Sequence, residues 1–313
     1  MSHLNHLDLT RDALSSSTLN QALKILGDRW TTQVILGAFL GIQKFDDWQS
    51  NLQIPRHTLA QRLKLLTHLN ILQTRLYQDK PVRSSYHLTQ KGLGLYDCVL
   101  MIWSWEQRWG KDSLNIPKQL HHQNCGQQLK PQLVCTACQQ PSHIRDLHFE
   151  LHPNRQLMPT VTEQYRTTRI SVADTPGQQL GLRVDRWSLL IIASVMLGCH
   201  YFDQMSHALG IGTRVLSNRL AQMIERVFLI CEVDLNDTRR RFYKLTPKSR
   251  DLLGYMVCLS TWASRHHLHQ FSSIQPKHTA CGHAFVPRVI CNTCCEPLQA
   301  WRVQYREHEL SAS

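Results

Sequence analysis

The chain has 313 residues, of which 42% are hydrophobic, and its formal net charge is +12. This composition fits a globular protein, and the positive charge favours a polyanionic partner such as nucleic acid. The longest apolar run, residues 187–199, is too short for a membrane span, which takes roughly 20 residues. Residues 1–12 lack a signal-peptide pattern, so we expect a cytoplasmic protein whose 11 cysteines serve metal or redox chemistry rather than disulfides.

The sequence repeats itself. Asp-Arg-Trp stands at residues 28–30 and again at 185–187, an offset of 157, and a single one-residue gap after Trp105 and Trp262 changes the offset to 156. The chain therefore contains two copies of one domain of roughly 150 residues. Other matched pairs are Gly41 and Gly198, Phe45 and Phe202, Leu59 and Leu216, Arg62 and Arg219, Tyr86 and Tyr243, and Thr89 and Thr246.

The first copy begins with helical patterns. Apolar spacing predicts helices over residues 19–26 and 30–40, a short helix from about Phe45 to Asn51, and a longer helix opened by Pro55. Strand-like residues 72–77 and 84–88 then predict a β-hairpin. Helix, turn, helix and hairpin together indicate a winged helix-turn-helix.

A long helix is expected next, capped by Thr89 and reaching Trp109. Trp103, Trp105 and Trp109 make it rich in large rings, which either fill the core of one domain or pack on the other copy. Residues 151–182 have no helical stripe and are expected to form a strand or two plus a linker.

The helix after each turn has one face suited to DNA. Leu59, Leu63 and Leu66 form its core face in the first copy, and Leu216, Leu220 and Met223 do so in the second. The opposite faces carry polar and cationic side chains that match base edges and phosphates, although an ordinary solvated face is the alternative. The candidate DNA-contacting residues on these helices are Arg56, His57, Thr58, Gln61 and Lys64, and Thr213, Arg214, Ser217 and Asn218.

The hairpin turns add further cations, because Lys80 and Arg83 lie in the first and Arg239, Arg240 and Arg241 in the second. Such loops reach phosphates or a minor groove. Arg62 and Arg219 lie beside the core stripe, so each either contacts DNA or supports the fold through an acidic partner.

Each copy ends in a cysteine-rich segment with zinc-ligand spacing. One His and three Cys make a closed tetrahedral Zn²⁺ set without an open position for water, which predicts two structural zinc ions per chain. Free thiols or a regulatory disulfide are the alternative, and His121 and His283 compete as the histidine ligands. The expected sets are His122, Cys125, Cys135 and Cys138, and His278, Cys281, Cys291 and Cys294.

The chain resembles the HxlR family of bacterial winged helix-turn-helix transcription regulators. The resemblance rests on residues 22–30, 54–63 and 86–92, and a closing Cys-Gly and Cys-x2-Cys segment resembles an extension found in part of that family. It implies a mainly α fold with small β-hairpins (α+β). The expected organisation is a winged helix-turn-helix domain at 17–112, a zinc-ribbon-like segment at 118–150, a linker at 151–176, a second winged helix-turn-helix domain at 177–269 and a second ribbon-like segment at 275–306.

The resemblance also implies a sequence-specific regulator of double-stranded DNA. Because family relatives form homodimers, two domains in one chain suggest an intramolecular pseudo-dimer that reads two non-identical half-sites. The alternative is a protein-interaction or scaffold module without specific DNA binding. No nucleophile with a base at a recognisable spacing and no phosphate-binding glycine loop is found, so we do not expect an enzyme. The sequence leaves open whether two chains associate through the Trp-rich helices and whether a small molecule acts as effector.

Overall fold

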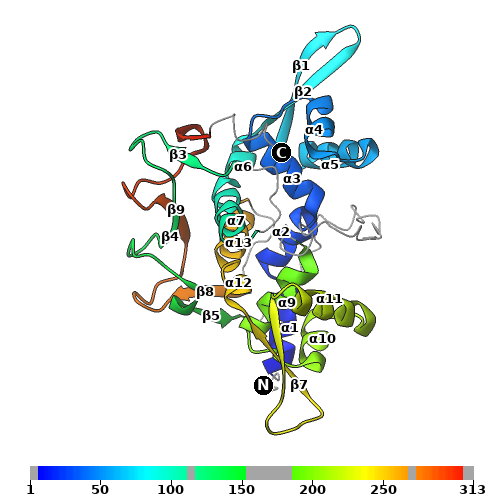
Figure 1. Cartoon of the computed structure of the whole chain (residues 1–313), viewed down its shortest axis with the longest axis vertical. Helices are drawn as coiled ribbons and strands as arrows, with labels where there is room; N and C mark the ends of the chain where they lie inside the picture. Colours follow the sequence, from blue (N-terminus) through cyan, green and yellow to red (C-terminus); the bar gives the residue numbers. More distant parts are fainter. Residues whose placement is uncertain (1–5, 111–116, 153–184, 267–272, 306–313) are drawn as a thin grey trace. The chain divides into compact units, whose positions relative to one another are not determined.

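The computed structural model describes residues 6–110, 117–152, 185–266 and 273–305, which fall into two compact units (Figure 1). Each unit is made from two separate stretches of the chain. Unit 1 contains residues 1–25 and 135–287, and unit 2 contains residues 26–134 and 288–313. Each unit therefore joins one winged helix-turn-helix to cysteine-rich segments from both copies of the repeat. The five-segment division of the sequence remains a prediction.

Unit 2 holds the winged helix-turn-helix of the first copy. Its first helix begins where the Asp28 carboxylate accepts the backbone N–H groups of Trp30 and Thr31, both at 3.1 Å, which satisfies two donors of the first turn. The expected helices and hairpin are confirmed, although Pro55 lies at the N-cap rather than inside the helix. The elements are α3 (Arg29–Phe39), α4 (Phe45–Leu52), α5 (Arg56–His68), β1 (Leu72–Asp79), β2 (Val82–Leu88), α6 (Gln90–Leu93) and α7 (Tyr96–Trp109).

The single long helix expected from Thr89 to Trp109 is wrong, because the structure breaks it into α6 and α7. Thr89 caps only the short α6, where its hydroxyl accepts the N–H of Gly92 at 3.1 Å. The backbone then tightens, and the N–H of Leu95 bonds to the carbonyl of Gly92, three residues back, at 3.0 Å. The second copy breaks at the same place.

Unit 1 holds the winged helix-turn-helix of the second copy. Asp185 caps its first helix by accepting the N–H of Ser188 at 2.9 Å, the counterpart of Asp28. The described elements are α9 (Arg186–Met196), α10 (Phe202–Leu209), α11 (Thr213–Glu225), β6 (Leu229–Val233), β7 (Arg241–Leu245), α12 (Pro247–Arg250) and α13 (Leu253–Arg265).

The N-terminal helices α1 (His6–Ser15) and α2 (Thr18–Leu26) contact this second helix-turn-helix. The Asp8 carboxylate accepts a hydrogen bond from His207 at 2.7 Å, and Asn20 accepts one from Arg186 at 3.0 Å. All of α2 but its last residue lies in unit 1, although the sequence assigned this helix to the first domain. Helix α1 was not expected, because its short apolar stripe buries only Thr10, Ala13 and Leu14.

The cysteine-rich segments pair across the two copies of the repeat. In unit 2, β3 (Leu120–His122) pairs antiparallel with β10 (Val303–Tyr305), so that Leu120 faces Tyr305. In unit 1, β5 (Leu147–Leu151) pairs antiparallel with β8 (Ile274–His278), so that Phe149 faces Pro276. Strands β4 (Pro131–Cys135) and β9 (Pro287–Cys291) form a further pair, which lies in unit 2 except for one end residue of each strand.

Two short 3₁₀ turns precede the last strands, η1 (Ile144–Asp146) before β5 and η3 (Ala300–Arg302) before β10. The expected linker at 151–176 lies outside the described residues except for its first two positions. None of the described helices has both the length and the apolar character that a membrane span requires.

Candidate nucleic-acid interface and metal sites

Helix α5 presents a polar surface in unit 2. Leu59, Leu63 and Leu66 are at most 1% exposed and fix the buried face. On the opposite side Gln61 and Lys64 are exposed, together with Arg56 and His57, while Thr58 is half-buried. The His57 ring lies 3.2 Å from the Gln61 side-chain nitrogen, one helical turn away. The fold thus leaves Arg56, His57, Gln61 and Lys64 exposed and Thr58 only partly exposed.

Helix α11 repeats this arrangement in unit 1 with a different surface. Leu216, Leu220 and Met223 are buried, and Thr213, Arg214, Ser217 and Asn218 are all exposed. Val215 and Ile224 are exposed on the same helix, at 48% and 37%. Its accessible surface is therefore less polar than that of α5.

Arg62 and Arg219 support the fold instead of facing solvent. The Arg62 guanidinium lies 3.2 Å from the carboxylate of Asp28, and that of Arg219 lies 3.1 Å from Asp185. Arg62 is 7% exposed. Burial raises the pKa of Asp185 even though Arg219 favours its charged form. The sequence left two alternatives for Arg62 and Arg219, contact with DNA or support of the fold through an acidic partner. The structure contains the second, because each guanidinium lies beside an aspartate.

The two hairpin turns differ in how their cations are placed. In the first, Lys80 and Arg83 are exposed. In the second, Arg240 donates two hydrogen bonds to the Asp203 carboxylate at 3.0 and 3.3 Å and lies 3.8 Å from the centroid of the Tyr201 ring. Arg239 pairs with Asp237 at 3.2 Å, and Arg241 is exposed. Much of the second turn's charge is thus already compensated.

The hairpins also expose apolar side chains that the sequence did not single out. Val82 is 74% exposed in the first hairpin and Leu235 is 99% exposed in the second, with Leu76 and Tyr77 also exposed in the first. Arg75 is exposed on β1 and adds a cation to that wing. Strand alternation does not account for these residues, because Arg75, Leu76 and Tyr77 are consecutive and all exposed on β1. Leu235 lies in the turn between β6 and β7.

The eight cysteines and histidines that the sequence singled out gather into two clusters, each of which could hold a metal ion. One contains His122 with Cys125, Cys291 and Cys294; the other contains Cys135 with Cys138, His278 and Cys281. The expected sets, each within one copy, are wrong, because each cluster takes one pair of ligands from each copy. The antiparallel pairing of strands from opposite copies causes the exchange. His121 and His283 belong to neither cluster.

The spacing of the donor atoms fits a tetrahedral site. Bond lengths of about 2.3 Å to sulfur and about 2.0 Å to nitrogen place two sulfurs about 3.8 Å apart, and sulfur and nitrogen about 3.5 Å apart. The Sγ atoms of Cys125 and Cys291 lie 3.9 Å apart, and those of Cys135 and Cys281 lie 4.0 Å apart. Four of the six distances from Sγ to the Nδ1 of His122 or His278 run from 3.2 to 3.6 Å.

Four identical tight turns bring the ligand pairs together. In each, the residue after the second ligand has positive φ and donates its N–H to the carbonyl of the first ligand at 2.7 to 2.9 Å. Glycine is suited to that conformation and occupies it twice. The N–H of Gln140, just beyond one such turn, lowers the pKa of the Cys138 thiol and so favours the thiolate that binds metal. The four residues with positive φ are Gly126, Gln139, Gly282 and Cys295.

The two histidine ligands differ in what their second ring nitrogen contacts. The Nε2 of His278 lies 3.2 Å from the Ser142 hydroxyl. The Nε2 of His122 is buried and has no hydrogen-bond partner in the described part of the chain. At the repeat position equivalent to Ser142 the chain carries Leu298, which is buried and has no hydroxyl. The cluster in unit 1 is therefore the better supported of the two.

Comparison with known proteins gives several relatives. An uncharacterised HTH-type transcriptional regulator of Mycobacterium tuberculosis is 32% identical over 136 residues, which cover 44% of this chain and 86% of the relative. A second, from Bacillus subtilis, is 29% identical over 90 residues, which cover 28% of this chain and 83% of the relative. These relatives are named as transcriptional regulators and not as enzymes.

A solved structure of a candidate transcription factor from Pseudomonas aeruginosa aligns at 22% identity and a TM-score of 0.30, over 39% of this chain and 84% of that one. The model of the HxlR-like helix-turn-helix family matches the chain twice, at residues 25–114 and 183–271, which together exceed half of its length. The tandem repeat is thereby confirmed, and the chain belongs to the HxlR-like helix-turn-helix family.

Proposed function

We propose that this protein is a sequence-specific regulator of transcription that binds double-stranded DNA through both winged helix-turn-helix domains. The observation that carries the proposal is the pairing, found twice, of an exposed polar helix with a cationic hairpin that follows it directly. Such a helix fits the major groove while the hairpin reaches the neighbouring backbone. The net charge of +12 adds attraction for the phosphates.

The two domains act as an intramolecular pseudo-dimer on two unlike half-sites. His57, Gln61 and Lys64 face one half-site, and Arg214 and Asn218 face the other, because the exposed faces of α5 and α11 differ in charge and in apolar content. For major-groove helices on one side of the duplex, the half-site centres lie about 34 Å apart. We assign the protein to the bacterial cytoplasm, associated with the nucleoid when it is bound to DNA.

Each cluster of one histidine and three cysteines binds one structural Zn²⁺. Four ligands leave no open position for substrate or water, so the metal would stabilise the fold instead of taking part in a reaction. Metal analysis of the purified chain should give about two zinc ions per molecule.

Selection of binding sites from a random DNA pool tests the main proposal. The wild-type chain should enrich a bipartite motif, and Gln61→Ala and Arg214→Ala should each relax preference at different positions of it. If neither variant changes the base preference of the selected motif, the assignment of α5 and α11 as the helices that contact the bases is wrong.

The exposed apolar side chains of the wings favour a second candidate, an interaction module that binds protein instead of DNA. Titration with DNA at two salt concentrations separates the candidates. A regulator loses affinity steeply as salt rises, whereas an interaction module shows little affinity at either concentration.

A further inference from the structure

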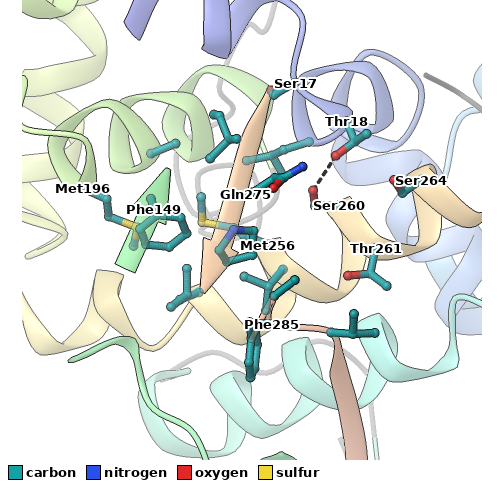
Figure 2. Close-up of a pocket in the computed structure, with 18 of the residues that line it drawn as sticks. Ser17, Thr18, Phe149, Met196, Met256, Ser260, Thr261, Ser264, Gln275 and Phe285 are labelled. Carbon is teal, nitrogen blue, oxygen red and sulfur yellow. Dashed lines mark hydrogen bonds between the residues drawn. The ribbon is translucent and has the colours of Figure 1, made fainter. Parts of the chain in front are cut away.

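Unit 1 contains a cavity of about 410 Å³ that the proposed DNA and zinc sites do not use. Its walls come from α2, α9 and α13 and from the paired strands β5 and β8 (Figure 2). Small-molecule sites in proteins commonly have volumes of about 300 to 1,000 Å³ and mostly apolar linings. The volume of this cavity thus lies within the range that is usual for small-molecule sites.

The lining is chemically divided. Figure 2 shows the Met196 and Phe149 side chains together at one end, with Met256 beside them. Toward the other end lie the hydroxyls of Thr18 and Ser260, which hydrogen-bond to each other at 2.5 Å, and those of Thr261 and Ser264 (Figure 2). Arg265 also lines the cavity and is exposed, so it belongs to the rim at the end of α13. A ligand would meet an apolar interior with hydroxyls and a cation at one side.

Comparison of the two copies shows that several residues lining this space are smaller than their counterparts in the first copy. At the positions equivalent to Ala193, Met196 and Ser260, the first copy carries Leu36, Phe39 and Trp103. In unit 2 the Phe39 ring packs on Tyr96 with 5.2 Å between centroids, and the Trp103 indole N–H donates to the Pro117 carbonyl at 2.8 Å. Tyr96 in turn is the equivalent of Leu253, another residue that lines the cavity. The same fold can therefore fill this region with rings, and unit 1 does not.

We propose that this cavity binds a small amphipathic carboxylate, with an alkyl chain or ring against Met196 and Phe149 and the carboxylate beside Arg265. A guanidinium binds a carboxylate through paired charge-assisted hydrogen bonds, and the threonine and serine hydroxyls add donors on the same side. The alkyl chain or ring of the ligand contributes to binding because its apolar surface is removed from water at the apolar end of the cavity. The proposal does not depend on DNA binding.

Isothermal titration calorimetry of the full zinc-loaded chain, without DNA, tests this with octanoate and its uncharged counterpart 1-octanol as probes. The wild type should bind one octanoate with an affinity about tenfold above that for octanol, the equivalent of roughly one charge-assisted hydrogen bond. Arg265→Gln should remove that preference and leave octanol binding unchanged. Arg108→Gln is the matched control and should leave both affinities unchanged, because Arg108 follows Trp105 in α7 by three residues as Arg265 follows Trp262 in α13.

Two filling variants taken from the first copy locate the site. Ser260→Trp and Ala193→Leu should each weaken both probes at least tenfold while thermal unfolding shows that the chain remains folded. Arg265 is on the surface, so the Arg265→Gln result stands even if a filling variant does not fold. Absence of saturable octanoate binding by the wild type at millimolar concentration, equal effects of Arg265→Gln and Arg108→Gln, or undiminished binding by a folded filling variant would overturn the proposal.

Discussion

Two cations on α5, only two residues apart, lie in opposite environments. Arg62 is buried and pairs with Asp28 at 3.2 Å, whereas Lys64 is exposed on the face that we assign to DNA. Asp28 also caps α3, so the ion pair joins α5 to α3. Charge of the same sign thus stabilises the fold at one position and is available for binding at the other.

Replacement of these residues should separate the two effects. Arg62→Met leaves the Asp28 carboxylate without its cation and should lower the free energy of unfolding by about 1–3 kcal/mol, because Asp28 is partly hydrated. Lys64→Ala should change stability by less than about 0.5 kcal/mol and weaken DNA binding in a salt-dependent way. Urea unfolding and DNA titration measure both quantities. Equal destabilisation by the two variants would contradict this assignment.

Ser142 and Leu298 give the two metal clusters different support. A hydrogen bond to the second nitrogen of a ligating histidine fixes the ring, and its loss costs about 10- to 100-fold in metal affinity. Ser142→Ala should therefore weaken zinc binding by the unit 1 cluster, where the hydroxyl lies 3.2 Å from His278. Leu298→Ser should strengthen the unit 2 cluster, where the His122 ring nitrogen has no described partner. Competition with a chelator measures both, and a wild-type chain that releases both metals at one chelator concentration would count against the asymmetry.

Among the elements, the two wings differ most in how freely their charge can act. In the second wing Asp203, on α10, holds Arg240 through two hydrogen bonds. Arg240 must break its ion pair with Asp203 before it can contact a phosphate, so this ion pair lowers the contribution of Arg240 to DNA affinity.

Asp203→Asn should release Arg240 and raise DNA affinity at low salt by more than the change of one charge alone. Asp47→Asn, in the matching helix of the first copy, makes the same change of charge at an exposed position and is the control. DNA titration over a range of salt concentrations gives both affinities. Equal increases in the two variants would show that Arg240 is not restrained by its pair.

The elements were predictable from the sequence to different degrees. The helices and hairpin of the helix-turn-helix follow from apolar periodicity and from caps such as Asp28, which are local properties of the chain. The His-x2-Cys and Cys-x2-Cys turns are local in the same sense, and all eight of their cysteines and histidines lie in the clusters. Which turns meet is decided by strand pairing between distant segments. Because the two copies offer the same spacing, the sequence could not distinguish pairing within a copy from pairing across copies.

At the scale of the whole molecule, the exchange of ligand pairs can be tested by double substitution. Cys125→Ser with Cys291→Ser removes two ligands from one cluster and should leave about one zinc per chain. Cys125→Ser with Cys135→Ser removes one ligand from each cluster and should leave less than one. Pairing within each copy predicts the reverse order. Cys295→Ser, at an exposed residue outside both clusters, should keep two zinc ions, as measured by metal analysis after dialysis against a chelator.

Each cluster combines ligands from both copies of the repeat, so neither cluster can form on the ribosome until the second copy has been synthesised. Cys125 is synthesised 166 residues before Cys291, and Cys135 is synthesised 146 residues before Cys281. At translation rates of 5–20 residues per second, each interval lasts roughly 7 to 33 seconds. During that time the nascent chain carries His122, Cys125, Cys135 and Cys138 without the ligands that complete the two clusters of the folded protein. Neither cluster has all four ligands until Cys281 in one and Cys294 in the other have been synthesised, so a chain terminated before His278 would carry thiols that lack their partners in both clusters.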